Sequence, residues 1–208
     1  PPYIVVKDAA LNAAYRQRYA SCHMKYSLGA PFTERFFDLA LTGNGQPAGF
    51  VGLITANSFM KREFGSELIE QVLPRLDLTH VVDTSGAYIP GHGTPTVILF
   101  GRHRAPVGEE VRTVMGIKGE PGTPDDPAYG LVWSAIVEQI DRAGSESEFV
   151  SVDDTPRQTF NKHPWSIGGG GAAALLETID EASDERLDSL LAVHRYTTQV
   201  GNRMVTRE

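Results

Sequence analysis

The sequence predicts an α/β fold. Two apolar runs typical of buried strands, residues 48–59 and 78–86, flank an amphipathic segment at 62–76, and a third such run follows at 94–102. Strand, helix and strand joined by short connections is the pattern of a doubly wound sheet with helices on its faces. The composition agrees with a globular protein, because 41% of the 208 residues are hydrophobic and 22% are charged.

Two helices are expected ahead of the first strand. Residues 9–20 form a polar stretch with helical character. In the next segment, apolar side chains recur at i, i+4, i+5 and i+8, which places them on one face of a helix; they are Phe32, Phe36, Phe37 and Ala40. From this periodicity alone, the face is expected to be part of the core.

The segment at 62–76 is expected to be a third helix. Its apolar residues lie along one stripe, as in a helix that packs on a sheet; they are Phe64, Leu68, Ile69, Val72, Leu73 and Leu76. A glycine- and proline-rich loop, residues 86–93, separates the strands that follow it.

The character of the sequence changes after about residue 105. Residues 109–119 and 147–155 predict strands, and about 127–142 predict a helix between them. A glycine loop and two short helices are expected over 168–196. We therefore expect a boundary near 105–110, with a second, α+β region beyond it.

Charge and cysteine content limit the possible functions. The formal net charge of −7 argues against this stretch being a strong phosphate-binding surface by itself. Cys22 is the single cysteine, which excludes an internal disulfide and suits a reducing cytoplasm. His23 beside it does not complete a zinc site, so no metal is expected. No apolar run reaches the length of a membrane span, and no signal pattern opens the chain.

The chain begins with Pro1, Pro2 and Tyr3. Pro-Pro is common in loops and alone is a weak signal. Further segments follow in order: Lys25, Tyr26, Leu28 and Phe32 at the opening of a helix, then a glycine turn and a strand ending in Asn-Ser-Phe at 57–59, then a helix and a strand ending in Val-Val-Asp at 81–83.

Taken together, these segments resemble the later half of the γ-type adenine-specific (N6) DNA methyltransferases, whose catalytic motif is Asn-Pro-Pro-Tyr/Phe. Residues 88–104 and 163–171 look most like one branch, the methyltransferases of the phage-growth-limitation, or BREX, defence systems. The resemblance implies the second half of a Rossmann-like, S-adenosylmethionine-dependent methyltransferase sheet at 1–105. It implies the incomplete start of a C-terminal α+β, target-recognition-side region at 106–208.

The resemblance also assigns catalytic residues. The N6 amine of adenine is a poor nucleophile, so the site needs preorganised acceptors for its hydrogens and a base flipped out of the duplex. By resemblance, Pro1 supplies a carbonyl acceptor, Pro2 stiffens the motif, and Tyr3 stacks on the flipped base. Phe32 resembles the residue that packs against the adenine ring of S-adenosylmethionine, although periodicity alone favours core.

The sequence does not decide which residue contacts the face of the base opposite Tyr3. Where the family usually has a phenylalanine, this chain has Ile89, beside Tyr88. Tyr88 is the better chemical candidate, Ile89 is the better positional match, and a ligand-free hairpin loop is the alternative. His92 is either a base contact or a solvated loop histidine, and we expect the latter.

Three other stretches carry weaker signals. Asn57 and Ser58 follow a strand end, where open α/β sheets bind ligands, but a helix cap is equally expected. The glycines at 168–171 lack the end of a Walker loop and are interpreted as a hinge. The basic spot at 102–104 contacts a phosphate or, more commonly for such runs, is a solvated strand end.

We therefore expect an internal piece of a longer cytoplasmic enzyme, inactive alone, that acts on double-stranded DNA with S-adenosylmethionine in a phage-defence or restriction–modification system. The family's cofactor-binding glycine turn and ribose-binding acid would precede residue 1, so we expect weak cofactor binding by this chain alone. Other phage-defence proteins are possible partners. The alternative is a non-catalytic, methyltransferase-like scaffold in a defence complex.

Overall fold

The computed structural model divides the chain into two compact units, Pro1–Gly170 and Gly171–Glu208. The residues it describes are 3–43, 47–166, 168–169, 175, 178–179, 182, 196–200 and 203–207. In the second unit, β7 (Tyr196–Val200) and β8 (Arg203–Arg207) form an antiparallel pair. Most of the expected glycine loop and short helices at 168–196 lies outside the described residues.

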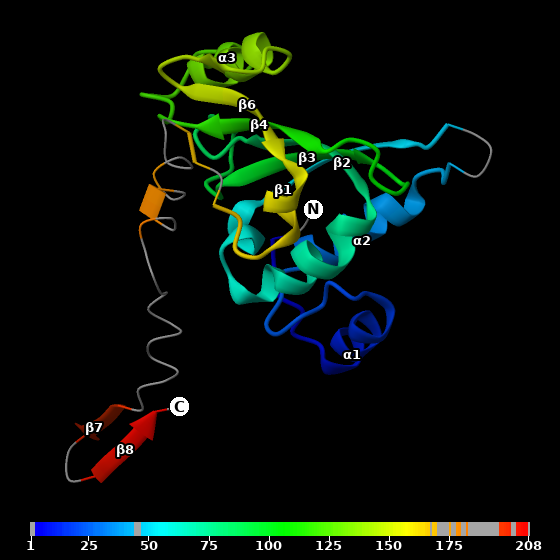
Figure 1. Ribbon diagram of the computed structural model, residues 1–208, viewed down its shortest axis with the longest axis vertical. Helices are drawn as coiled ribbons and strands as arrows, with labels where there is room; N and C mark the ends of the chain where they lie inside the picture. Colours follow the sequence, from blue (N-terminus) through cyan, green and yellow to red (C-terminus); the bar gives the residue numbers. More distant parts are fainter. Residues whose placement is uncertain are drawn as a thin grey trace. The chain divides into compact units, whose positions relative to one another are not determined.

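Six strands of the first unit form one mixed sheet in the order β1-β3-β2-β4-β6-β5. Figure 1 labels five of them, all except β5. The strands are β1 (Phe50–Ala56), β2 (Asp77–Asp83), β3 (Thr96–Arg102), β4 (Glu110–Gly116), β5 (Ser145–Glu146) and β6 (Val150–Pro156). The expected α/β class is therefore found, as a mixed sheet with helices.

The strand directions differ from those of a purely parallel sheet. β3 lies between β1 and β2 and is antiparallel to both, whereas β2 and β4 are parallel neighbours. The connection from β2 to β3 contains no helix, and a chain that returns without a crossover pairs antiparallel. As a result β1, β2 and β4 run in the same direction, and their carboxyl ends meet at one edge of the sheet.

Helical segments pack on both faces of the sheet. Val81 of β2 belongs to the core that contains Phe37 and Trp165, while its neighbour Val82 belongs to the core that contains Ile136. Adjacent residues of a strand point to opposite faces, so these two cores lie on opposite sides of β2. This two-sided burial explains why the strand is apolar at consecutive positions.

The three α-helices are α1 (Ala9–Arg18), α2 (Gly29–Leu39) and α3 (Leu131–Gln139). In α2 the expected core face is partly wrong. Phe37 is buried, with 1% of its surface exposed, but Phe32 and Phe36 are 37% and 42% exposed. The buried side of α2 instead includes Ala30 and Thr33. Ala30, Thr33 and Phe37 are spaced i, i+3 and i+7, so they lie on one face of the helix.

The segment at 62–76 is helical but irregular, where the sequence predicts one regular helix. It consists of a 3-10 turn at Glu63–Gly65, a π-helical stretch at Leu68–Val72 and a 3-10 turn at Leu73–Arg75. Pro74 cannot donate a backbone hydrogen bond and its ring collides with the carbonyl four residues earlier, which disfavours a regular α-helix here. The predicted apolar stripe is nonetheless buried, apart from the partly buried Val72.

The sheet continues past the expected boundary near 105–110, because β4 pairs with β2 in register His80 to Arg112. The division into 1–105 and 106–208 stays a prediction for the whole protein. Three further 3-10 helices complete the described elements: Asn57–Met60, Pro127–Tyr129 and Arg157–Asn161.

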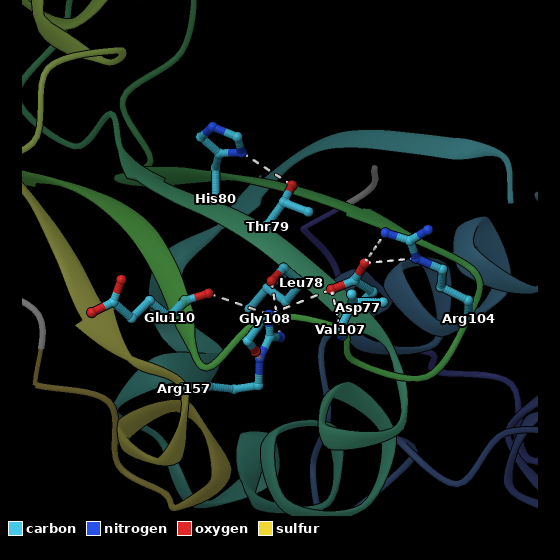
Figure 2. Close-up of polar contacts among 9 residues, drawn as sticks. All are labelled: Asp77, Leu78, Thr79, His80, Arg104, Val107, Gly108, Glu110 and Arg157. Carbon is cyan, nitrogen blue, oxygen red and sulfur yellow. Dashed lines mark hydrogen bonds and ion pairs between the residues drawn. The ribbon is translucent and has the colours of Figure 1, made fainter. Parts of the chain in front are cut away.

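A polar network closes the amino end of β2 (Figure 2). The Asp77 carboxylate, whose side chain is 4% exposed, accepts 2.8 Å contacts from Arg104 and a 3.4 Å contact from Arg157. Arg157 also donates to the backbone oxygens of Leu78, Gly108 and Glu110. One carboxylate and one guanidinium thus tie β2, β4 and the loop between β3 and β4 together.

Candidate functional site

The candidate site lies at the carboxyl edge of β1, β2 and β4, where open α/β sheets bind ligands. The loop that follows β2 is anchored at its base. Thr84 Oγ1 and Thr96 Oγ1 are hydrogen bonded at 2.8 Å, and the Thr84 amide donates to the Thr96 carbonyl at 3.1 Å. The Asn57 amide, just after β1, donates to Pro95 O at 3.0 Å. The loop ends are therefore fixed while its tip is free to present side chains.

The tip of this loop is a tight turn. The His92 amide donates to the Ile89 carbonyl at 3.2 Å, and Gly91 has a φ of 66°. Proline followed by a glycine with positive φ is the sequence preference of a type II turn. His92 is the last residue of this turn.

His92 lies against Tyr3. Their ring centroids are 5.0 Å apart with an interplanar angle of 38°. His92 is half-buried, and its Nε2 is covered without a hydrogen-bond partner among the described residues. The expectation that His92 is solvated is therefore wrong. Burial also raises the pKa of the Tyr3 phenol, which stays protonated at neutral pH.

Tyr88 and Ile89 line a different space, a cavity of about 280 Å³. Its walls are mainly apolar; they are Ile54, Thr84, Ala87, Tyr88, Ile89, Pro90, Pro127, Ala128 and Trp133. Tyr3 is not among them. The structure thus brings together Tyr3 with His92, and Tyr88 with Ile89 and Trp133, at neighbouring positions around the same loop.

The Lys25–Phe32 segment is joined to the Tyr3 segment. The Leu28 amide donates to the Ile4 carbonyl at 2.8 Å. Tyr26 is buried and donates from its hydroxyl to Asn12 Oδ1 at 2.8 Å, and burial raises its pKa to about 12. A Cβ on Gly29 would lie 2.9 Å from Thr55 Oγ1, so a larger residue would force Thr55 to shift, and glycine favours this close approach of α2 to the carboxyl end of β1.

Phe32 projects from the first turns of α2 and is partly exposed, with its ring 6.5 Å from that of Phe36 in a tilted arrangement. The alternative that Phe32 is simply core is not what the structure shows. An exposed aromatic close to the Tyr3 segment is available to stack on a planar ligand ring. Pro1 and Pro2, the other expected catalytic residues, lie outside the described residues.

The weaker candidates have contacts within the chain. Asn57 begins a 3-10 helix with no side-chain capping bond, so the cap interpretation is not supported. Arg102 lies 3.7 Å over the Phe50 ring, His103 Nδ1 donates to the Ala40 carbonyl at 3.1 Å, and Arg104 pairs with Asp77. The basic spot at 102–104 is thus engaged in intramolecular contacts. Of the glycines at 168–171, only the first two are described.

One residue of this region, Trp133, and one contact, that of His92 with Tyr3, are not indicated by the sequence. Trp133 enters the cavity from α3, and no local signal indicates this because the contact depends on tertiary packing. The pairing of His92 with Tyr3 joins residues far apart in the chain, although Pro90-Gly91 does predict the turn that presents the histidine. Within the described ranges, no cluster of three or more His, Cys, Asp or Glu side chains could hold a metal ion. No helix in that part of the chain has the length and apolar character to cross a bilayer.

The chain is similar in sequence to methyltransferases. Its relatives include the adenine-specific methyltransferase PglX of Streptomyces coelicolor, with 54% identity over 189 residues, or 88% of the chain. They also include the type II methyltransferase M.XhoI of Xanthomonas vasicola, with 33% identity over 85 residues, or 40% of the chain. The expected resemblance to adenine-specific methyltransferases is confirmed by these matches.

The matched segment is a small part of each relative, 16% of PglX and 15% of M.XhoI. A solved structure described as the basis of complex assembly and conformational transition of the type I R-M system covers 71% of this chain and 35% of its own. Its TM-score is 0.38 and its identity 16%. No protein-family model matches the chain.

Proposed function

We propose that this chain is part of a DNA methyltransferase that transfers a methyl group to the N6 amine of adenine. The observation that carries this function is the 54% identity to the adenine-specific methyltransferase PglX over 88% of the chain. The substrate is double-stranded DNA, and the setting is a phage-defence (BREX) or restriction–modification system, where other defence proteins are partners. The net charge of −7 is consistent with a DNA grip that lies outside this stretch.

Tyr3 is the stacking platform for the target base. An adenine inside the duplex cannot expose N6 to attack, so it must be flipped into the site, and stacking on an aromatic ring contributes roughly 1–3 kcal/mol per base. The hydrogen bond from the Leu28 amide to the Ile4 carbonyl and the contact of Tyr3 with His92, in the loop after β2, support this role. Pro1 accepts from the N6 amine through its carbonyl, and Pro2 holds that backbone rigid.

S-adenosylmethionine is the methyl donor, and it supplies an electrophilic methyl group on a sulfonium centre. Among the described residues, Phe32 fits such a cofactor, because its ring is exposed on α2, a helix tied to the Tyr3 segment through Leu28. Phe32 stacks on the adenine ring of the cofactor and orients it. The Phe36 ring lies beside it, with the two ring centroids 6.5 Å apart.

The six-stranded sheet is the second half of a Rossmann-like methyltransferase sheet. β1, β2 and β4 run in one direction, which gathers the ligand loops at one edge. β1 is an edge strand in the described part of the chain, and its free edge can pair with a further strand.

Tyr88 and Ile89 line the cavity beside the loop after β2, and they contact the target base from there. The cavity volume of about 280 Å³ is close to the lower end of ligand pockets, which suits one ring rather than a whole nucleotide chain. Tyr88 offers the larger stacking surface, and Ile89 contributes dispersion contacts.

The experiment that tests this function compares the native host with a strain from which the gene is deleted. Single-molecule sequencing of genomic DNA reads N6-methyladenine in its sequence context. We expect one sequence motif to lose its methylation in the deletion strain and to regain it when the gene is restored. If every methylated motif is retained, the protein is not the methyltransferase, and the scaffold alternative takes its place.

A further inference from the structure

The sequence suggests Tyr88 or Ile89 for the face of the base opposite Tyr3, but neither of these residues lies against the Tyr3 ring. Tyr88 and Ile89 line the cavity with Trp133, and Tyr3 does not reach that cavity. The imidazole of His92 is the ring that lies 5.0 Å from the Tyr3 ring.

The His92 ring also has a polar atom, Nε2, that makes no hydrogen bond within the described part of the chain. This atom is also covered. An unpaired buried polar group is unfavourable, and such groups in native proteins commonly mark a functional position.

A planar base fits between the two rings after a small opening. Two stacking contacts of about 3.5 Å each require ring centroids about 7 Å apart, so the pair must open by about 2 Å from 5.0 Å. His92 stands between Gly91 and Gly93, and a Cβ on either glycine would meet no atom within 4 Å. The backbone on both sides of the histidine therefore has space to move, while the loop ends stay fixed at Thr84 and Thr96.

We propose that His92 is the second base-contacting ring of the site, stacking on the face of the flipped adenine opposite Tyr3. This role rests on the proposed N6-adenine methylation. Tyr88 and Ile89 then form a side wall rather than the second face. His92 acts by contact with the base and takes no part in moving the methyl group.

The test uses the full-length protein and a synthetic duplex that carries the motif found by genomic sequencing. The kcat/KM for N6 methylation is measured with the target adenine paired and with it opposite an abasic site. We expect His92→Ala to lower kcat/KM about tenfold on the paired target, from loss of one stacking contact. On the abasic duplex, where extrusion is easier, the loss shrinks to less than about threefold.

Two further variants separate stacking from folding. His92→Phe keeps a ring without nitrogens and should stay within about threefold of the wild-type protein on both duplexes. His163→Ala removes another histidine with an unpartnered Nε2, outside this site, and should leave kcat/KM unchanged.

The outcomes distinguish the two proposals. If the wild-type protein does not methylate the duplex, the proposed function fails and the role of His92 falls with it. If the wild-type protein methylates but His92→Ala is equally active, only the assignment of His92 is wrong. A His92→Phe variant as impaired as His92→Ala, or an equal loss on both duplexes, also overturns the stacking role.

Discussion

The two ends of β2 differ in how completely their polar groups are paired. At the amino end, the buried carboxylate of Asp77 contacts two guanidinium groups, and Arg157 also donates to the backbone carbonyls of Leu78, Gly108 and Glu110 (Figure 2). At the carboxyl end, the loop after Asp83 leaves a covered histidine nitrogen unpaired and borders a cavity of about 280 Å³.

This difference indicates that the amino end of β2 contributes mainly to stability and the carboxyl end mainly to function. Fully paired buried charges hold elements together, and removing one partner is strongly destabilising. Unpaired groups and open volume at the carboxyl ends of parallel strands are what a ligand uses. We therefore expect substitutions at the amino end to change folding, and those at the carboxyl end to change methylation.

The largest effect is expected for Asp77→Ala. Removing the carboxylate leaves Arg157, whose side chain is 14% exposed, without its charge partner, and the free energy of unfolding should fall by about 3 kcal/mol. Urea denaturation of the full-length protein measures this change. Asp83→Ala, at the other end of the strand, removes one exposed hydrogen bond to the Ser85 amide and should cost less than about 1 kcal/mol. Equal losses of unfolding free energy for Asp77→Ala and Asp83→Ala would contradict the proposed difference between the two ends of β2.

Tyr3→Ala should produce the largest loss of methylation. Loss of the stacking platform should lower kcat/KM roughly tenfold to a hundredfold, with the urea midpoint unchanged. Tyr3→Phe and Tyr3→Trp keep a π-face and should remain close to the wild-type rate. A Tyr3→Phe variant as inactive as Tyr3→Ala would replace stacking by a hydrogen bond from the phenol.

Smaller effects are expected for the side wall. Tyr88→Ala should lower kcat/KM several-fold and change the fluorescence of 2-aminopurine placed at the target position, since it removes an aromatic wall of the cavity. Ile89→Ala should have a weaker effect on both signals, because an aliphatic group gains less from contact with a base. A larger effect of Ile89→Ala than of Tyr88→Ala would assign the base contact to Ile89. If neither substitution changes the signals, the residues of this cavity do not contact the base.

The smallest effect concerns His80, in the middle of β2. Burial, and then the nearby Arg112, lower the pKa of its imidazole in the folded protein. The unfolded chain then binds the proton more tightly, so stability is retained above the ordinary histidine pKa of about 6.5 and is lost as the pH falls below it. Urea midpoints measured from pH 8 to pH 5 should fall less for His80→Gln than for the wild-type protein. Parallel curves would show that His80 does not contribute.

The strands could be predicted from the sequence because their apolar runs are local and buried on both sides. Their order could not be predicted. β3 inserts between β1 and β2 through pairings such as Leu53 with Leu99 and Val81 with Leu99, which no local pattern specifies. In α2, three phenylalanines were equally apolar, and only packing decides that Phe37 is buried while Phe32 and Phe36 are not.

The site was predicted in part. The resemblance to adenine-specific methyltransferases drew attention to Tyr3 and to the loop after β2, and the similarity to PglX confirms that resemblance. The residue roles stay predictions. The contact of His92 with Tyr3 was missed, because a histidine between two glycines is usually solvated and nothing in the local sequence indicates a partner almost ninety positions away.

The central claim is that the target base is bound at the carboxyl end of β2. It is tested most directly by photo-crosslinking the full-length protein to a duplex with 5-iodouracil in place of the target adenine. Irradiation joins this base to an aromatic side chain in contact with it, and mass spectrometry identifies the peptide. We predict crosslinks to Tyr3 or to residues 86–93. Crosslinks confined to the segment around Arg104 and Glu110, at the amino end of β2, would contradict the account.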